Sequence, residues 1–129
     1  MILTKGLIKA DIIAARQAIE YYQEHNVKDI KNVAAYHIQQ AAEKLIKYQI
    51  FASGAAFNHS QMYTHNIERL IVYGDSLGIK LDVPGYIRQN SLKITDWEAG
   101  SRYDVAFSIR IDTLMTACKV VTEWFDRIQ

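Results

Sequence analysis

The sequence predicts an all-α protein, an up-and-down bundle of four long helices plus a short fifth, in one domain over residues 1–129. Apolar residues recur at alternating spacings of three and four along four segments, which is the periodicity of one helix face. No stretch offers a convincing pair of strands, because the valines and isoleucines already belong to these helical patterns. With 129 residues, 50% of them hydrophobic, the chain is long enough for a single core.

The first predicted helix runs from Lys5 to about His25. Thr4 precedes it and is a candidate N-cap, since a threonine hydroxyl can accept a hydrogen bond from a free amide of the first turn. Its expected apolar face consists of Ile8, Ile12, Ala15, Ile19 and Tyr22.

The second predicted helix runs from about Lys31 to Ala52 and ends at Gly54. Small side chains at positions 34, 35, 41 and 42 let a neighbouring helix approach closely, so we expect this to be the central helix. Glu43 and Lys47 lie four residues apart, in the favourable order for a helical ion pair. The apolar stripe contains Ala34, Ala35, Ile38, Ala41, Ala42, Leu45, Ile46 and Gln49.

The third predicted helix follows Thr64, a candidate N-cap, and is closed by Gly78. Its core-facing residues are expected to be Ile67, Leu70, Ile71 and Leu77. A short helix is then predicted after Asp82, because Pro84 is tolerated in a first helical turn. Its core-facing residues would be Tyr86, Ile87 and Leu92.

The last predicted helix occupies the C-terminal part of the chain, with Asp104 as a candidate cap. Its apolar face is expected to contain Phe107, Ile111, Leu114, Cys118, Val121, Phe125 and Ile128. Two connections, residues 53–65 and 95–104, are longer than an ordinary bundle loop. Long ordered loops often carry functional residues.

Charge and composition exclude several classes of protein. Fifteen basic and fourteen acidic residues leave a net charge of +1, so any nucleic-acid contact must be local. The single Cys118 cannot form an intramolecular disulfide, which favours a reduced compartment. The sequence contains no signal-peptide pattern and no apolar run long enough for a membrane span, so we expect a cytoplasmic protein without membrane contact.

Few residues suggest a catalytic or metal site, and we predict no cofactor, no metal site and no catalytic residue. His59 and His65 have neither a third ligand at a diagnostic spacing nor a cysteine pair. Glycine-rich phosphate loops are absent, and Cys118 falls on the core face of the last helix. His37 lies beside the stripe of the second helix, where a histidine is more often a structural hydrogen-bonding group than a catalytic one.

Arg102 and Tyr103 are the main candidates for ligand binding. They are predicted to lie in a polar loop just before the last helix, whose N-terminus would favour an anion. Arginine could hold a phosphate there while tyrosine stacks on a base. A second interpretation stays open, in which Arg102 pairs with Glu98 or Asp104 and Tyr103 plugs the end of the bundle.

Three sequence motifs together resemble the HEPN domain, whose name abbreviates higher eukaryotes and prokaryotes nucleotide-binding. They are AAYHIQQAAEKLIK at 34–47, THNIERLI at 64–71 and SRYD at 101–104, and the resemblance covers residues 5–127. The Arg102-Tyr103 pair matches the place where the family often carries Arg-Tyr-Pro, with Asp104 here in place of the proline. The resemblance implies a helical bundle, usually dimeric, often encoded beside a minimal nucleotidyltransferase in a toxin–antitoxin-like pair.

Many members of that family are metal-independent ribonucleases whose motif is arginine, four to six residues, then histidine. No arginine of this sequence is followed by a histidine at that distance. Cleavage through the 2′-hydroxyl needs a proton acceptor poised near neutral pH, which histidine supplies best. The departure from the motif therefore argues against the common ribonuclease activity.

The sequence thus predicts a HEPN-like module that binds a nucleotide, makes a local RNA contact or binds a nucleotidyltransferase-like partner. The alternatives are an RNA-cleaving toxin with a non-standard active site, using His37 or His65 with Arg102, and a structural dimer without a ligand. We expect an anionic ligand near the start of the last helix, contacted by Arg102 and Tyr103, with Lys44 and Lys47 as weaker candidates. A homodimer is expected, because the apolar stripes on residues 34–52 and 107–128 exceed what one core consumes.

Overall fold

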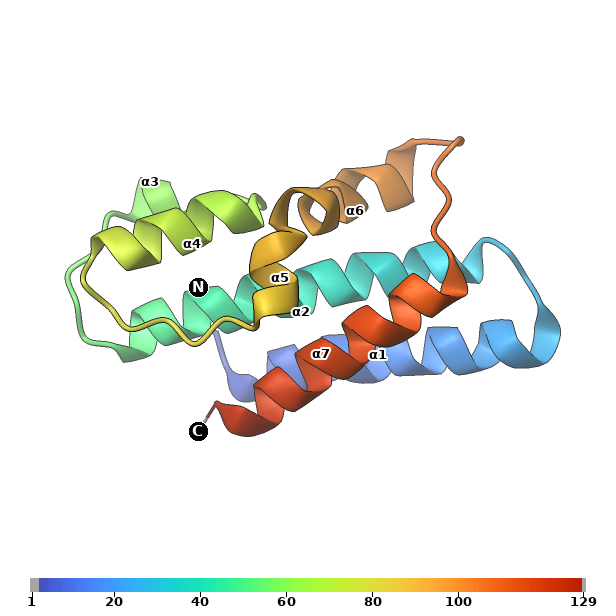
Figure 1. Ribbon diagram of the computed structural model, residues 1–129, viewed down its shortest axis with the longest axis horizontal. Coiled ribbons are helices and arrows are strands. Elements are labelled where there is room, and N and C mark those ends of the chain that lie inside the picture. The colour runs from blue at the N-terminus through green and yellow to red at the C-terminus, as the bar shows by residue number, and fades with distance from the viewer. Residues whose placement is uncertain (1–2, 129) are drawn as a thin grey trace.

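Residues 3–128, the part of the chain described by this computed structural model, form helices and connections without a strand. The helices are α1 (Lys5–His25), α2 (Ile30–Ala52), α3 (His59–Met62), α4 (Ile67–Ser76), α5 (Gly85–Gln89), α6 (Ser91–Tyr103) and α7 (Ile111–Arg127). Figure 1 shows α2 along the middle of the molecule, with α1 and α7 on one side and α4 and α6 on the other. The predicted all-α class is confirmed.

The central position predicted for the second helix is also confirmed. Ala34, Ala35, Ala41 and Ala42 are fully buried, and α2 contacts α1, α4, α6 and α7. Side chains without bulk allow these neighbours to lie close to its backbone. The predicted apolar stripe of α2 is buried by the same chain from Ala34 to Ile46.

Local signals define the ends of the first two helices. The hydroxyl of Thr4 accepts a hydrogen bond of 3.3 Å from the amide of Leu7, which confirms the predicted N-cap. Asn26 closes α1 in the left-handed conformation, with φ of 56°, and its N–H donates to the carbonyl of Tyr22. Gly54 follows the end of α2 with φ of +77°, a conformation that favours glycine.

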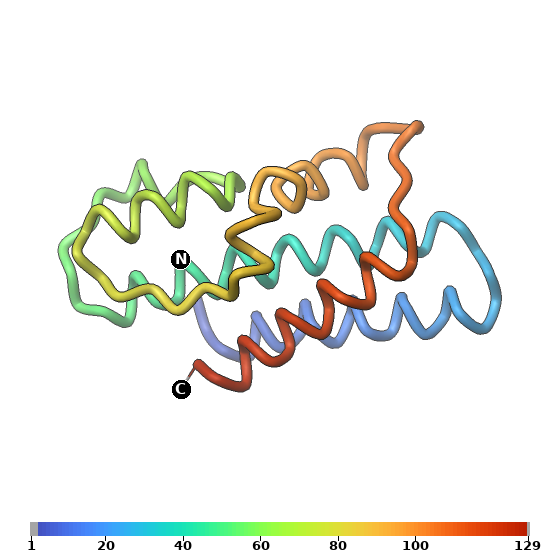
Figure 2. Tube along the Cα trace, viewed as in Figure 1, coloured from blue at the N-terminus to red at the C-terminus, as the bar shows by residue number. Residues whose placement is uncertain are grey.

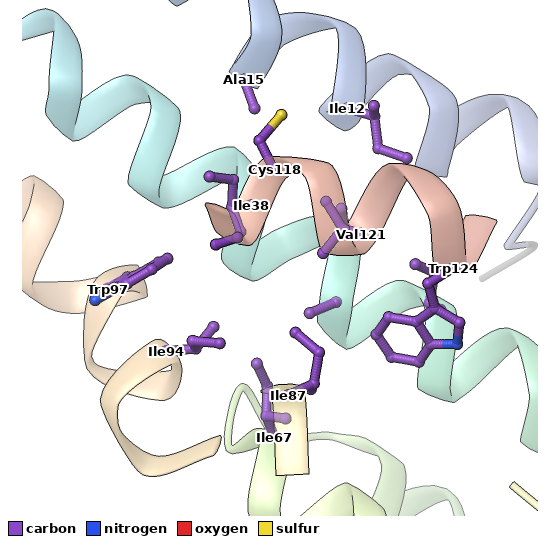
Figure 3. Packing of buried hydrophobic residues seen from close by; sticks show 14 of the residues in the cluster. Ile12, Ala15, Ile38, Ile67, Ile87, Ile94, Trp97, Cys118, Val121 and Trp124 are labelled. Atoms are coloured by element: carbon purple, nitrogen blue, oxygen red, sulfur yellow. The ribbon is translucent and has the colours of Figure 1, made fainter. Parts of the chain in front are cut away.

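The labelled side chains of Figure 3 show that the core residues of α7 lie between those of α1 and those of α4, α5 and α6. Val121 and Trp124 of α7 are fully buried, and so is Ile38 of α2. The indole Nε1–H of Trp124 donates a 2.7 Å hydrogen bond to the carbonyl of Asp82, in the connection before α5. The polar tip of this large side chain is therefore satisfied while its ring fills the core.

The N-cap expected for the third helix was wrong. Asn66, and not Thr64, precedes the first turn of α4, and its side chain accepts a hydrogen bond of 3.0 Å from the amide of Arg69. Thr64 instead accepts from the amide of Asn66 itself, in a local turn. The expected stop is confirmed, since Gly78 follows α4 with φ of +75°.

The largest corrections concern residues 91–110. Residues 95–103 of the predicted loop at 95–104 belong to α6, and α7 begins at Ile111 and not near Phe107. The carboxylate of Asp104 accepts from the amide of Ala106 at 2.9 Å, forming a tight turn, so it does not cap the last helix. Leu92, expected to face the core, is 59% exposed. The connection at 53–65, expected to be a loop, contains the short helix α3.

Figures 1 and 2 show which helix ends lie towards the same end of the long axis. The first turn of α1 and the last turn of α7 lie towards the same end of the long axis. The α1–α2 turn, the end of α6 and the connection at 104–110 lie towards the other. Within residues 3–128, no helix combines the length and the apolar run that a membrane crossing needs.

Candidate functional site

A row of polar side chains is buried along α2. Gln39, Gln40, Glu43 and Lys47 are each less than a tenth exposed. Such groups are costly to bury unless they are paired. Gln40 donates to the Gln39 side-chain oxygen at 2.8 Å, Gln39 donates to Glu43 at 3.2 Å, and Lys47 donates to Glu43 at 2.8 Å. The predicted Glu43–Lys47 ion pair is therefore confirmed, and it is buried.

His65 connects this row to α6. Its Nδ1 lies 2.9 Å from Oε1 of Glu43, and its Nε2 lies 3.9 Å from Oε1 of Glu98. A carboxylate can only accept, so Nδ1 carries the proton of the Glu43 hydrogen bond. The backbone carbonyl of His65 accepts a further bond of 3.0 Å from Gln39. The residues before α4 are thus held against both α2 and α6.

Arg102 lies in the last turn of α6. Its guanidinium pairs with the carboxylate of Glu98 and donates through Nε to the Glu98 carbonyl at 3.2 Å, so the predicted ion pair is confirmed. Its Cζ lies 5.2 Å from the ring centroid of Tyr36 and 4.7 Å from that of Tyr103. Tyr103 is 72% exposed, so the expectation that it plugs the bundle end was wrong.

Arg102 and Tyr103, predicted in a loop, are instead the last two residues of α6. They line a cavity of about 300 Å³ together with Lys28 and Lys31. Lys31 donates to the carbonyl of Ile109 at 2.9 Å, which fixes the connection between α6 and α7 against α2. No hydrogen bond or ion pair joins the Lys28 ammonium to any of residues 3–128. The cavity therefore contains three cationic side chains and an exposed aromatic ring.

The weaker candidates, Lys44 and Lys47, line a different cavity of about 440 Å³ beside the second half of α2. Lys44 donates to Oδ2 of Asp11 at 2.5 Å. Nδ1 of His37 lies 2.8 Å from the other oxygen of the same carboxylate, so this histidine forms a hydrogen bond within the fold. The four predicted ligand-binding residues are thus divided between two cavities.

Comparison with known proteins adds one decisive observation. The family model of the HEPN domain matches residues 11–128, nearly the whole chain. The chain belongs to the HEPN domain family. Searches among curated proteins and among solved structures found no significant match. Membership supports a nucleotide- or RNA-related module in general terms.

Two other features of this HEPN domain bear on its chemistry. Burial raises the pKa of the Cys118 thiol, and its side chain lies in the core, so it is not an activated nucleophile. Among residues 3–128, no three histidine, cysteine, aspartate or glutamate side chains converge as metal ligands would.

Sequence reasoning missed several residues of the Arg102 cavity. Lys28 and Lys31 lie three residues apart at the start of the second helix, and this spacing was a usable signal for a basic helix terminus. Tyr36 gave no such signal, because only tertiary structure brings it under Arg102.

Proposed function

We propose that this HEPN domain binds a nucleotide in the cavity between the start of α2 and the end of α6. The observation that carries the proposal is the convergence of Arg102 and Tyr103 with Lys28 and Lys31 around one cavity. A nucleotide offers the matching chemistry, because its phosphate attracts cations and its base can stack on an aromatic ring.

The positive charge of the cavity comes from three cationic side chains, Lys28, Lys31 and Arg102, and from the start of a helix. Lys28 is exposed and has no acceptor within the described residues, so its ammonium can bind a phosphate without breaking a contact. The 23-residue helix α2 begins beside it, and the dipole of a helix start favours anions. Arg102 adds a third cation, although Asp29 and Asp104 at the same cavity reduce the net charge.

Arg102 can contact a ligand although it already pairs with Glu98. The Arg102 side chain is 40% exposed, whereas that of Glu98 is only 11% exposed, so a ligand can reach the guanidinium while it stays paired with Glu98. A charge-assisted arginine–phosphate contact in a partly dry site contributes about 1.5–3 kcal/mol. The stack on Tyr36 and Tyr103 limits the freedom of the guanidinium and therefore lowers the entropic cost of binding.

Calorimetric titration with AMP tests this proposal. The wild type is compared with Arg102→Ala and Lys28→Met, and with Lys93→Met as a matched control, an exposed lysine of α6 outside the cavity. We expect roughly tenfold weaker binding for Arg102→Ala and Lys28→Met and unchanged binding for the control. Equal affinity of all four proteins would remove this cavity as the site, and absence of AMP binding by the wild type would overturn the proposal.

We also propose that the domain works as a homodimer with a nucleotidyltransferase-like partner in a toxin–antitoxin-like pair in the cytoplasm. The support is family membership and, for the compartment, the single Cys118 thiol. Purification of the chain from its native cells should recover such a partner, and the neighbouring gene should encode it. A lone gene with no recoverable partner would contradict the pairing.

A second candidate function, metal-independent RNA cleavage, is favoured by one contact. His65 and Arg102 both approach the carboxylate of Glu98. Because Nδ1 of His65 donates to Glu43, the neutral ring presents Nε2 as the proton acceptor for a 2′-hydroxyl. The neighbouring Arg102 could stabilise negative charge that develops on the phosphate.

Expression in a growth assay separates this activity from simple binding. Cleavage predicts growth arrest that both His65→Ala and Arg102→Ala abolish, whereas His59→Ala, a histidine outside the Glu98 contact, keeps the arrest. Arrest that survives His65→Ala would exclude His65 as the acceptor.

A further inference from the structure

The second cavity, defined by Lys44 and Lys47, lies away from the proposed nucleotide site. It measures about 440 Å³ and is bounded by the second half of α2 and by the connection that contains α3. Its residues on α2 begin at Gln40, whereas those of the Arg102 cavity end at Asn32. These eight residues correspond to about 12 Å along the helix axis. The two cavities can therefore hold separate ligands.

The walls of this second cavity are largely apolar. Leu3, Phe51 and Met62 line it, and Met62 is buried. Phe51 packs edge-on against Phe57, with ring centroids 5.1 Å apart, which holds the connection after α2 against the helix. A volume of this size with apolar walls and a few polar groups is typical of a small-molecule site.

The polar groups of the cavity have more donors than acceptors. An ammonium group has three N–H donors, and Lys47 uses one of them for Glu43 and Lys44 one for Asp11. Within residues 3–128, neither ammonium makes another hydrogen bond or ion pair. Lys47 is buried, with only 9% of its side chain exposed, so its remaining donors have little access to bulk water.

Glu43 does not offer a matching site for a cation. Its Oε1 accepts from Gln39 and His65, and its Oε2 accepts from Lys47. A carboxylate with three donors has little capacity left for an incoming ammonium. Every buried polar side-chain atom among the described residues has a partner, but the two lysines have N–H groups to spare while Glu43 does not have free acceptor sites to match. The cavity therefore favours an anionic acceptor, which makes the stronger hydrogen bond to a lysine.

We propose that this cavity binds a small apolar carboxylic acid in its ionised form. The apolar body would lie against Leu3, Phe51 and Met62, and the carboxylate would accept from Lys47 and Lys44. A charged group alone would gain nothing from the apolar walls, and a neutral apolar molecule would leave the lysine donors unmet.

Titration with 2-naphthoate, followed by calorimetry, tests the proposal, with its neutral analogue 2-naphthamide as the second probe. We expect 2-naphthoate to bind the wild type with a dissociation constant below about 1 mM, and 2-naphthamide to bind roughly tenfold more weakly. Absence of 2-naphthoate binding at that concentration, or equal binding of the two probes, would overturn the proposal.

Variants then locate the site. Lys44→Met should weaken 2-naphthoate binding roughly tenfold, and Lys47→Met should do the same if it folds. Lys93→Met serves as the matched control, and Arg102→Ala tests separation from the nucleotide site; both should bind 2-naphthoate like the wild type. Unchanged binding by Lys44→Met, or weaker binding by Arg102→Ala, would contradict the assignment to this cavity.

Discussion

Arg127 holds Asp82 through two hydrogen bonds of 2.8 Å, from Nε to Oδ2 and from a terminal nitrogen to Oδ1. The pair ties the last turn of α7 to the connection between α4 and α5. The same connection receives the indole hydrogen bond of Trp124, through the backbone carbonyl of Asp82. One residue outside the helices therefore fixes the end of α7 with both its side chain and its backbone.

The Asp82–Arg127 pair predicts a stability difference that depends on pH. Hydrogen bonding from Arg127 lowers the pKa of Asp82 below its ordinary value of 3.8. The ion pair therefore stabilises the folded state fully above the unfolded-state pKa of Asp82. This stabilisation is lost as the pH falls through the lower folded-state pKa. We expect Arg127→Met to reduce the free energy of unfolding by about 0.2–1 kcal/mol near neutral pH, because both side chains are largely exposed.

Urea denaturation of the wild type and Arg127→Met at several pH values measures this difference. It should shrink as the pH falls below the ordinary pKa of the carboxyl. In an Asp82→Asn background, Arg127→Met should have little effect at any pH. A difference that stays constant into the acid range would show that packing of the arginine stem, and not the ion pair, is responsible.

The burial of Ile38 predicts how much stability the protein loses when a side chain in the core around α2 is shortened. It is fully buried and packs in the cluster drawn in Figure 3. Ile38→Ala should lower the free energy of unfolding by about 2–5 kcal/mol, because lost burial and a residual cavity both contribute. Ile13→Ala on α1, where the side chain is 41% exposed, should cost much less, and denaturation of the two variants makes the comparison. Equal costs would contradict the packing described for α2.

The burial of Cys118 predicts that its thiol reacts slowly in the folded state. Burial raises its pKa, so the reactive thiolate is scarce near neutral pH, and the core limits access of a reagent. Alkylation by iodoacetamide, followed by mass spectrometry, should be slow for the native protein and fast in urea. Rapid modification without urea would show that the α1–α7 contact opens readily.

Self-association remains a prediction. Large apolar side chains such as Tyr21, Val27 and Val33 are 40–47% exposed around the α1–α2 turn and could be buried in a dimer. We expect a dimer by light scattering at concentrations on the order of tens of micromolar. A monomeric mass at that concentration would exclude a dimer of moderate affinity.

The periodic parts of the fold could be predicted from the sequence because burial follows helix geometry directly. The four-three spacing located α1 and α2, and Thr4 located the first cap. The helix α6 could not be predicted from apolar spacing. Its buried positions are few, and they include the polar Ser91 and Glu98 beside Ile94 and Trp97. Phe107 has the opposite effect, because it continues the apolar spacing of α7 although it lies before the first residue of that helix.

The candidate site was predictable only in part. Arg102 and Tyr103 were found from their residue types, and the pairing of Arg102 with Glu98 follows from their four-residue separation on a helix. The partners from other elements were not predictable, because no local pattern indicates that Tyr36 lies under Arg102 or that His65 reaches Glu43. The cavity that contains the pair also lies beside the start of α2, and no local pattern indicates this neighbour.

The arrangement of the two chain ends has a practical consequence. The first turn of α1 and the last turn of α7 lie towards one end of the long axis, while the Arg102 cavity lies at the other, where α2 begins and α6 stops. An affinity tag, a surface anchor or a fluorescent label attached at either end would project away from that cavity. Immobilised protein should therefore keep the cavity open to solution, which makes surface-based binding assays with nucleotides practicable for this chain.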